Sequence, residues 1–318
     1  MTEVLPTEFA RIAQYFRPLA GPGALALGDD AAVFTPPQGR ELVIAADAMV
    51  AGVHFLPDDP ADLVARKLLR TNLSDLAAMG AAPLGYLLTV SVPRATPETW
   101  FAGFSAGLAA DQAAFGLHLL GGDTTSTPGP ISLSLTILGS VAPGTALRRN
   151  GAQAGDDIWA SGTIGDGALG LLAARGELPD PDGFLADRYR LPRPRLALGL
   201  ALVGIAHAAM DVSDGLVQDL SHICRASGLA AEIHAGKIPL SPAAQAANCL
   251  ELCLTGGDDY ELLFAAPPEA AEAILAASRA TGIAVTRIGT FRAGPAHVTT
   301  IGTDGNTLSL GSGGWSHL

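Results

Sequence analysis

The sequence predicts an α/β protein of two domains, on three observations. The chain has 318 residues, which suits two domains of ordinary size better than one. Strand-like apolar runs alternate with stretches of helical periodicity, which favours sheets covered by helices over an all-β design. A polar, glycine-rich segment over residues 146–157 interrupts this pattern, so we place the domains at residues 1–148 and 149–318.

The first half is expected to form three strands and two long helices. Apolar runs predict the strands, at residues 41–46, 84–92 and 131–141. Apolar residues at helical spacing predict the helices, at residues 60–79 and 97–115. Pro60, followed by Asp62 in the first turn, is a favourable start for the first of them. Residues 1–16 form an amphipathic pattern with early acidic residues, which indicates a helix and not a signal peptide.

The second half repeats the alternation, with strands expected at residues 230–233, 261–265 and 284–288. The segment 178–187 is rich in proline and aspartate and predicts an exposed connection. Gly165, Gly167 and Gly170 have the G-x-G-x-x-G spacing of a dinucleotide-binding turn. The acidic residue at the required distance, Asp187, lies in the proline-rich connection, so we expect only a tight turn from strand to helix.

Charge and hydropathy exclude several classes of function. Acidic residues number 31 and basic residues 19, giving a net charge of −12 that disfavours nucleic acid and anionic membranes as partners. The longest strongly apolar run, residues 196–210, contains His207 and is too short to span a bilayer. We therefore expect a cytoplasmic protein.

The cysteine pattern does not predict a disulfide framework. The chain has three cysteines, an odd number without paired spacing: Cys224, Cys249 and Cys253. A zinc site formed by Cys249 and Cys253 with His222 and His234 is an alternative, but the spacing matches no common structural pattern. Buried thiols are the expected outcome.

Six segments place aspartates beside Gly, Ser, Thr or Asn and between apolar residues. They are GDDAAVF at Gly28, AADAMVAGVHF at Ala45, NLSDLAAMGA at Asn72, GGDTT at Gly121, MDVSDGL at Met210 and GGDDYELLF at Gly256. Any one of them suits a helix cap or a turn. Six together suit Mg²⁺, which prefers oxygen ligands and often shares its shell with phosphates, and the glycines allow backbone to approach phosphate. The sequence contains no P-loop pattern, so ATP chemistry here must depend on metal ions and arginines.

In this order and spacing, the six segments resemble the thiamine-monophosphate kinase family of the PurM-like superfamily, from about Gly28 to the C-terminus. The resemblance implies a PurM-like fold: an N-terminal sheet with helices that pairs across a homodimer into a barrel, and a C-terminal α/β domain. It implies Mg²⁺-assisted in-line transfer of a phosphoryl group from ATP to thiamine monophosphate, the last step of thiamine diphosphate biosynthesis. Because the acceptor is already an anionic phosphate, no general base is needed.

The resemblance also implies residue roles, through the matching motifs. The expected ligands of several Mg²⁺ ions are Asp30, Asp47, Asp75, Asp123, Asp211 and Asp214. The expected ATP contacts are Gly122, Asp123, Arg149 and Ser213. The expected contacts to thiamine monophosphate are His54, Asp258 and Trp315.

This chain departs from the family pattern at four positions. Ala45 and Ala46 stand where hydroxyl residues are usual, so one metal site loses side-chain oxygens. Asp258 stands where glutamate is more frequent, and Ser105 stands where a tyrosine is frequent. Two alternatives therefore stay open. One is another PurM-like enzyme of the selenophosphate or aminoimidazole ribonucleotide synthetase type, and the other is a non-catalytic nucleotide or metal sensor.

Overall fold

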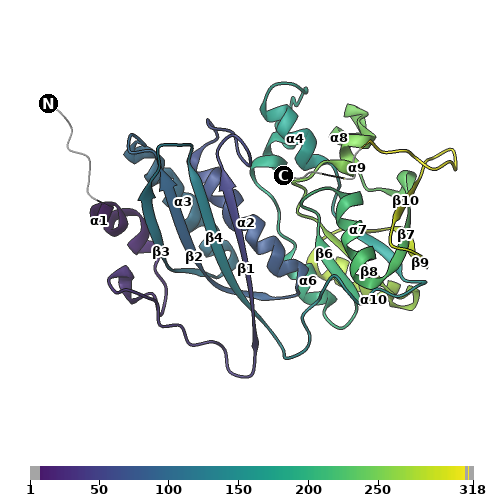
Figure 1. The fold of residues 1–318 in the computed structure, drawn as a ribbon, viewed down its shortest axis with the longest axis horizontal. Helices are drawn as coiled ribbons and strands as arrows, with labels where there is room; N and C mark the ends of the chain where they lie inside the picture. Colours follow the sequence, from purple (N-terminus) through teal and green to yellow (C-terminus); the bar gives the residue numbers. More distant parts are fainter. Residues whose placement is uncertain (1–7, 312–313, 315–318) are drawn as a thin grey trace. The chain divides into compact units, whose positions relative to one another are not determined.

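A computed structural model describes residues 8–311 and 314 (Figure 1). The chain divides into two compact units, each with its own sheet. Unit 1 consists of Met1–Leu73 and Ala82–Pro143, and unit 2 of Ser74–Ala81 and Gly144–Leu318. The predicted fold class, a two-domain α/β protein, is confirmed, and the structure shows that both sheets are mixed.

Unit 1 contains a four-stranded sheet in the order β1-β4-β2-β3. The strands are β1 (Glu41–Val50), β2 (Ala82–Val92), β3 (His118–Ser126) and β4 (Ser132–Val141). Neighbours are antiparallel except β2 and β3, which are parallel. Helices α2 (Ala61–Ala78) and α3 (Glu98–Phe115) lie against one face of this sheet (Figure 1). The sequence did not predict β3, which carries the GGDTT segment.

Alternation along the strands decides which face the helices cover. On β4, Leu133, Leu135 and Ile137 are fully buried, whereas the residues between them are half-buried. The opposite face presents apolar side chains: Ile44 on β1 is 62% exposed and Leu87 on β2 is 41% exposed. One face of the sheet therefore forms the core of unit 1, and the other is apolar and exposed within the chain.

The N-terminal segment of unit 1 departs from the sequence expectation. The predicted helix is present only as α1 (Glu8–Arg11) and a π-helical turn over Ile12–Phe16, while residues 1–7 lie outside the described part of the chain. Asp29 and Asp30 of the GDDAAVF segment stand in an exposed bend. Solvent therefore reaches both carboxylates, so neither has the desolvation cost of a buried charge.

Unit 2 contains a six-stranded sheet in the order β10-β7-β9-β5-β8-β6. The strands are β5 (Asp157–Ser161), β6 (Ala208–Asp211), β7 (Leu229–His234), β8 (Leu262–Ala266), β9 (Val285–Ala293) and β10 (Val298–Ile301). The helices are α4 (Asp166–Ala174), α5 (Phe184–Arg190), α6 (Leu196–Leu202), α7 (Leu216–Ser227), α8 (Pro242–Ala247), α9 (Leu250–Thr255) and α10 (Ala271–Thr281).

The central strands of this sheet are buried on both faces. Ile158 and Leu263 pack into one core with side chains of α7, and Trp159 and Phe264 pack into a second core with side chains of α6 and α10. Continuous apolar strands such as β8, whose five residues are all buried, follow from this two-sided covering.

Three further predictions from the sequence can be compared with the structure of unit 2. Gly165, with φ +90°, forms the predicted tight turn between β5 and α4. The expected exposed connection over residues 178–187 is wrong at its end, because α5 begins at Phe184 and buries Leu185 against neighbouring helices. All three cysteines are free thiols, two of them buried. Among the described residues, no helix is both long and apolar enough to cross a membrane.

Candidate functional site

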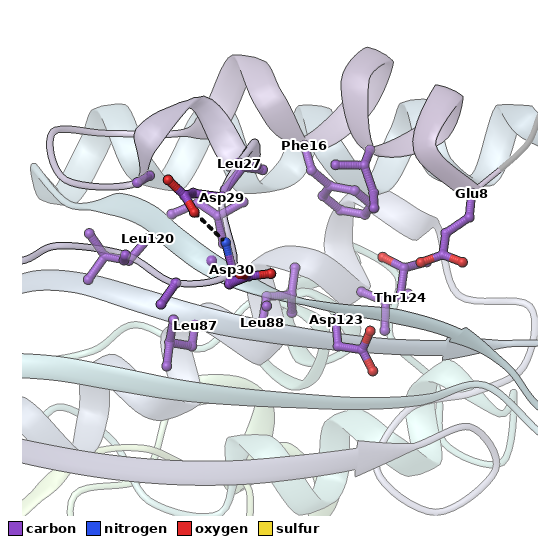
Figure 2. A pocket seen from close by; sticks show the side chains of 18 residues that line it. Glu8, Phe16, Leu27, Asp29, Asp30, Leu87, Leu88, Leu120, Asp123 and Thr124 are labelled. Atoms are coloured by element: carbon purple, nitrogen blue, oxygen red, sulfur yellow. Dashed lines mark hydrogen bonds between the residues drawn. The ribbon is translucent and has the colours of Figure 1, made fainter.

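Unit 1 contains a pocket of about 560 Å³ between its N-terminal segment and the strands β2 and β3 (Figure 2). Apolar side chains, including Phe16 and Leu120, line part of it. Four carboxylates also line it, those of Glu8, Asp29, Asp30 and Asp123. Figure 2 shows these carboxylates spread along the pocket and not gathered at one point. The pocket thus offers an apolar surface beside several oxygen ligands.

The GGD segment reaches this pocket on β3, where Gly122 brings the backbone close to β2. A Cβ atom on Gly122 would lie 1.8 Å from the carbonyl oxygen of Leu88, which excludes any other residue from this backbone position. Asp123 pairs with Thr89 in the parallel register and is exposed. The GGD segment therefore places the Asp123 carboxylate and the exposed backbone of Gly122 at the edge of the pocket.

Two other predicted residues of unit 1 lie on or after β1. Asp47 lies on the same face of β1 as the buried Val43 and Met49, and burial raises its pKa. His54 lies in the turn that follows, where its Nδ1 accepts the N–H of Val50 at 3.0 Å. The ammonium of the buried Lys67 donates to the carbonyl of His54 at 3.0 Å. Ring and backbone of His54 are thus both held in place.

In unit 2, the DVSDG segment forms a loop organised around the buried Asp219. One oxygen of that carboxylate, Oδ2, accepts the N–H groups of Ser213, Asp214 and Gly215 at 3.0, 3.1 and 3.2 Å. Burial, with the negative charges of Asp211 and Asp214, raises the pKa of Asp219 to about 7. The loop therefore concentrates negative charge that a cation would neutralise.

The end of α2 contributes to the same cluster. Ser74, fully buried, donates its hydroxyl to Oδ2 of Asp211 at 2.6 Å. Asp75 follows directly on the helix and is half-buried. Segments separated by more than a hundred residues thus bring the aspartates of NLSDL and MDVSDG into one unit.

Arg149 lies on a loop that the end of α7 fixes. The hydroxyl of Ser227 accepts the N–H groups of Gly151 and Ala152 at 3.3 and 3.2 Å and donates to the carbonyl of Arg149 at 3.4 Å. Partial burial and the positive charges of Arg225 and Arg149 lower the pKa of His222 on α7. A positive region therefore stands beside the DVSDG loop.

The GGDDYE segment is bonded directly to that loop. The N–H of Asp258 donates to the carbonyl of Ser213 at 2.9 Å, and the N–H of Tyr260 donates to the carbonyl of Val212 at 2.8 Å. A Cβ atom on Gly257 would lie 2.1 Å from the carbonyl oxygen of Ser213, so only glycine allows this approach. The segments predicted to contact nucleotide and acceptor are neighbours in unit 2.

The predicted residues divide between the two units. Unit 1 holds Asp30, Asp47, His54, Gly122 and Asp123, and unit 2 holds Asp75, Arg149, Asp211, Ser213, Asp214 and Asp258. Trp315 lies outside the described residues. Over residues 8–311 and 314, no three His, Cys, Asp or Glu side chains form a group that could hold a metal ion, the zinc alternative included.

The sequence reasoning missed two aspartates that organise these loops. Asp219 was not singled out, although it stands five residues after Asp214 on a helix face that turns toward the loop. Asp259 was treated only as part of the GGDDY segment, yet it is 1% exposed and accepts backbone N–H groups. An acid doublet beside glycines was the only available signal.

Comparison with known proteins first defines the class. The family model of the AIR synthase related protein N-terminal domain matches residues 28–141, and that of the C-terminal domain matches residues 153–302. These matches agree with the two-sheet fold and with the position of the aspartate segments. The fold and site thus define a member of the AIR synthase related proteins.

Closer relatives narrow the class to one family. The thiamine-monophosphate kinase of Caulobacter vibrioides is 50% identical over 297 residues, covering 90% of this chain and 84% of the relative. A crystal structure of thiamine-monophosphate kinase from Stenotrophomonas maltophilia K279a has a TM-score of 0.81 and 42% identity, covering 89% of this chain and 91% of that one. A structure described as AaThiL complexed with AMPPCP and TMP has a TM-score of 0.78 and 29% identity, covering 92% and 91%. The chain belongs to the thiamine-monophosphate kinase family.

Proposed function

We propose that this protein catalyses the transfer of the γ-phosphoryl group of ATP to the phosphate of thiamine monophosphate, giving thiamine diphosphate and ADP. The observation that carries the proposal is the 50% identity to a thiamine-monophosphate kinase over 90% of the chain. The relative described with AMPPCP and TMP supports the same pair of substrates. A cytoplasmic location for this reaction stays a prediction from the sequence.

The donor set of the chain fits Mg²⁺, a hard cation that prefers carboxylate and hydroxyl oxygens. The clearest support is the DVSDG loop, where burial and the neighbouring negative charges of Asp211 and Asp214 raise the pKa of Asp219. The residues proposed to hold Mg²⁺ are Asp30, Asp47, Asp75, Asp123, Asp211 and Asp214. When bound, Mg²⁺ supplies neutralisation of the phosphate charges.

The chain's own residues position the two substrates. Gly122 and Asp123 border the unit 1 pocket, whose apolar lining suits a nucleobase. Arg149, on its fixed loop, offers a planar guanidinium to phosphate oxygens, and the N–H of Ser213 belongs to the DVSDG loop. In the reaction, an oxygen of the acceptor phosphate forms a bond to the γ-phosphorus while the bond to the β–γ bridging oxygen breaks, and ADP leaves with that electron pair.

On the acceptor side, we assign His54, Asp258 and Trp315 to thiamine monophosphate. A carboxylate such as Asp258 complements the positive thiazolium ring of thiamine and not its phosphate. A shorter side chain than the glutamate frequent in the family requires the ring to approach the backbone more closely. This assignment distinguishes Asp258 from the aspartates proposed for Mg²⁺.

The protein is further proposed to be a homodimer formed by residues 1–148. The support is the exposed apolar face of the unit 1 sheet, on which Leu42, Ile44 and Leu87 are 41%, 62% and 41% exposed. A second copy covering this face would remove these side chains from water. Light scattering of the purified chain distinguishes a dimer from a monomer.

The activity is tested with ATP, Mg²⁺ and thiamine monophosphate, with product detected as thiamine diphosphate. We expect turnover that chelation of Mg²⁺ abolishes. Asp75→Asn should lose turnover while keeping the thermal midpoint, and Asp187→Asn, which changes a surface pair 3.6 Å from Arg193, should keep normal turnover. Tight binding of ATP and Mg²⁺ without any product would instead identify a nucleotide sensor, and product from another acceptor alone would identify a different PurM-like enzyme.

A further inference from the structure

The backbone around Asp258 is unusual, because the residues on both sides of Asp259 adopt left-handed conformations. Asp258 has φ +68° and Tyr260 has φ +52°, values that residues other than glycine rarely adopt. With this geometry the hydroxyl of Tyr260 donates to Oδ1 of Asp258 at 3.0 Å. The Asp258 carboxylate is therefore oriented by a side chain only two residues further along.

The side chain of Asp259 fixes this backbone to the start of α4. Its Oδ2 accepts the N–H of Gly165 at 2.7 Å, and its Oδ1 accepts the N–H of Gly167 at 2.9 Å, at the start of α4. Its carbonyl accepts a bond from the guanidinium of the buried Arg188 at 3.3 Å. Both the side chain and the main chain of Asp259 are therefore fixed inside unit 2.

Asp259 can approach the start of α4 this closely only because glycine stands there. A Cβ atom on Gly167 would lie 2.2 Å from the carbonyl oxygen of Asp258. The Asp259 carboxylate is thus the group that joins α4 to the GGDDYE segment, and Asp258 stands on the solvent side of that joint, half-buried.

We propose that Asp259 and Tyr260 are positioning residues for the acceptor: Asp259 fixes the left-handed segment, and Tyr260 fixes the carboxylate that this segment presents. The inference rests on the proposed function, in which Asp258 contacts the cationic part of thiamine monophosphate. A carboxylate that is already held in one orientation loses little conformational entropy when it binds its cation. Loss of either anchor therefore weakens binding of the acceptor and leaves binding of ATP unchanged.

Tyr260→Phe is the sharpest variant, since it removes one hydroxyl and keeps the ring. We expect the KM for thiamine monophosphate to rise roughly three- to tenfold, the cost of one hydrogen bond, with kcat and the KM for ATP within about twofold of the wild type. Asp259→Asn keeps the size of the side chain but replaces one acceptor by a donor. Its KM for thiamine monophosphate should rise roughly ten- to a hundredfold, because one of the two N–H groups then faces an amide donor and has no acceptor.

Asp219→Asn is the matched control within unit 2. Asp219 is as buried as Asp259 and also accepts backbone N–H groups, but it holds the DVSDG loop. This variant should raise the KM for ATP with Mg²⁺ and not that for thiamine monophosphate. Equal changes in both KM values for Asp259→Asn and Asp219→Asn would overturn the proposal, as would an unchanged acceptor KM in Tyr260→Phe.

Hydrogen exchange at the amides of Gly165 and Gly167 tests the anchor without any substrate. We expect faster exchange at these amides in Asp259→Asn and wild-type exchange in Asp219→Asn. Wild-type exchange in Asp259→Asn would refute the anchor whatever the substrate is. Absence of turnover in the wild type, with the expected exchange pattern, would instead remove the proposed function and the acceptor role with it.

Discussion

Glu261 offers the clearest test of what stabilises unit 2. Its side chain is fully buried and faces two arginines: Arg188 donates at 3.0 Å, and Nε of Arg195 donates at 2.6 Å. The hydroxyl of Ser161 donates to the same carboxylate at 2.6 Å. Glu261→Gln keeps the volume and removes the charge, which leaves Arg188, 3% exposed, with the longer 3.8 Å pair to Asp166 in place of the 3.0 Å pair to Glu261.

Removing one partner of a buried ion pair costs about 3–5 kcal/mol, because the remaining buried charge is then poorly compensated. For a unit of this size, each kcal/mol lowers the thermal midpoint by roughly 2–4 °C, so we expect a fall of roughly 6–20 °C. Calorimetry of the two proteins measures it. Glu232→Gln is the control, because its pair with Arg292 is at the surface, and its midpoint should not change measurably. A midpoint for Glu261→Gln within about 2 °C of the wild type would refute the argument from burial.

Two further predictions concern the glycine of β3 and the charge cluster of unit 2. Gly122→Ala should fail to form the β2–β3 pairing, because its Cβ would lie 1.8 Å from the carbonyl oxygen of Leu88, whereas Gly129→Ala, with its nearest atom at 3.6 Å, should fold normally; soluble yield and circular dichroism compare them. Without metal, the raised pKa of Asp219, about 7 against 3.8, favours the folded state below pH 4, and this contribution is lost as the pH rises through 7. Because a bound cation offsets that loss, Mg²⁺ should raise the thermal midpoint more at about pH 8 than at about pH 5.5, and an equal shift at both would contradict the charge cluster.

Local patterns in the sequence predicted most of the secondary structure, where burial on one face imposes a period. The apolar alternation of β4 and the helical spacing of α3 each correspond to an observed element. The pattern could not predict β3, because its sequence, HLLGGDTTS, has no apolar alternation and its pairing comes from β2. It also missed α5, whose helix is stabilised by distant partners such as Glu261 and not by its own periodicity.

The candidate site was predictable as a set of residues but not as an arrangement. Motifs indicated Asp258 and left Asp259 without a role, although the two are adjacent and chemically identical. The difference between them is burial, which depends on α4 approaching from elsewhere in the chain. The same limit applies to Asp30, which the motif indicated as a metal ligand without showing that it stands in an exposed bend.

Gly167 and Gly257 each face a backbone carbonyl, and this affects how glycine-rich sequence motifs are interpreted. Each is confined by a neighbouring carbonyl oxygen little more than 2 Å from any added carbon, whether or not a ligand is present. Evolution would retain these residues even in a descendant that had lost catalysis. The presence of these glycines therefore indicates only that the fold is intact. Whether a relative is active must be judged from its acidic and basic side chains.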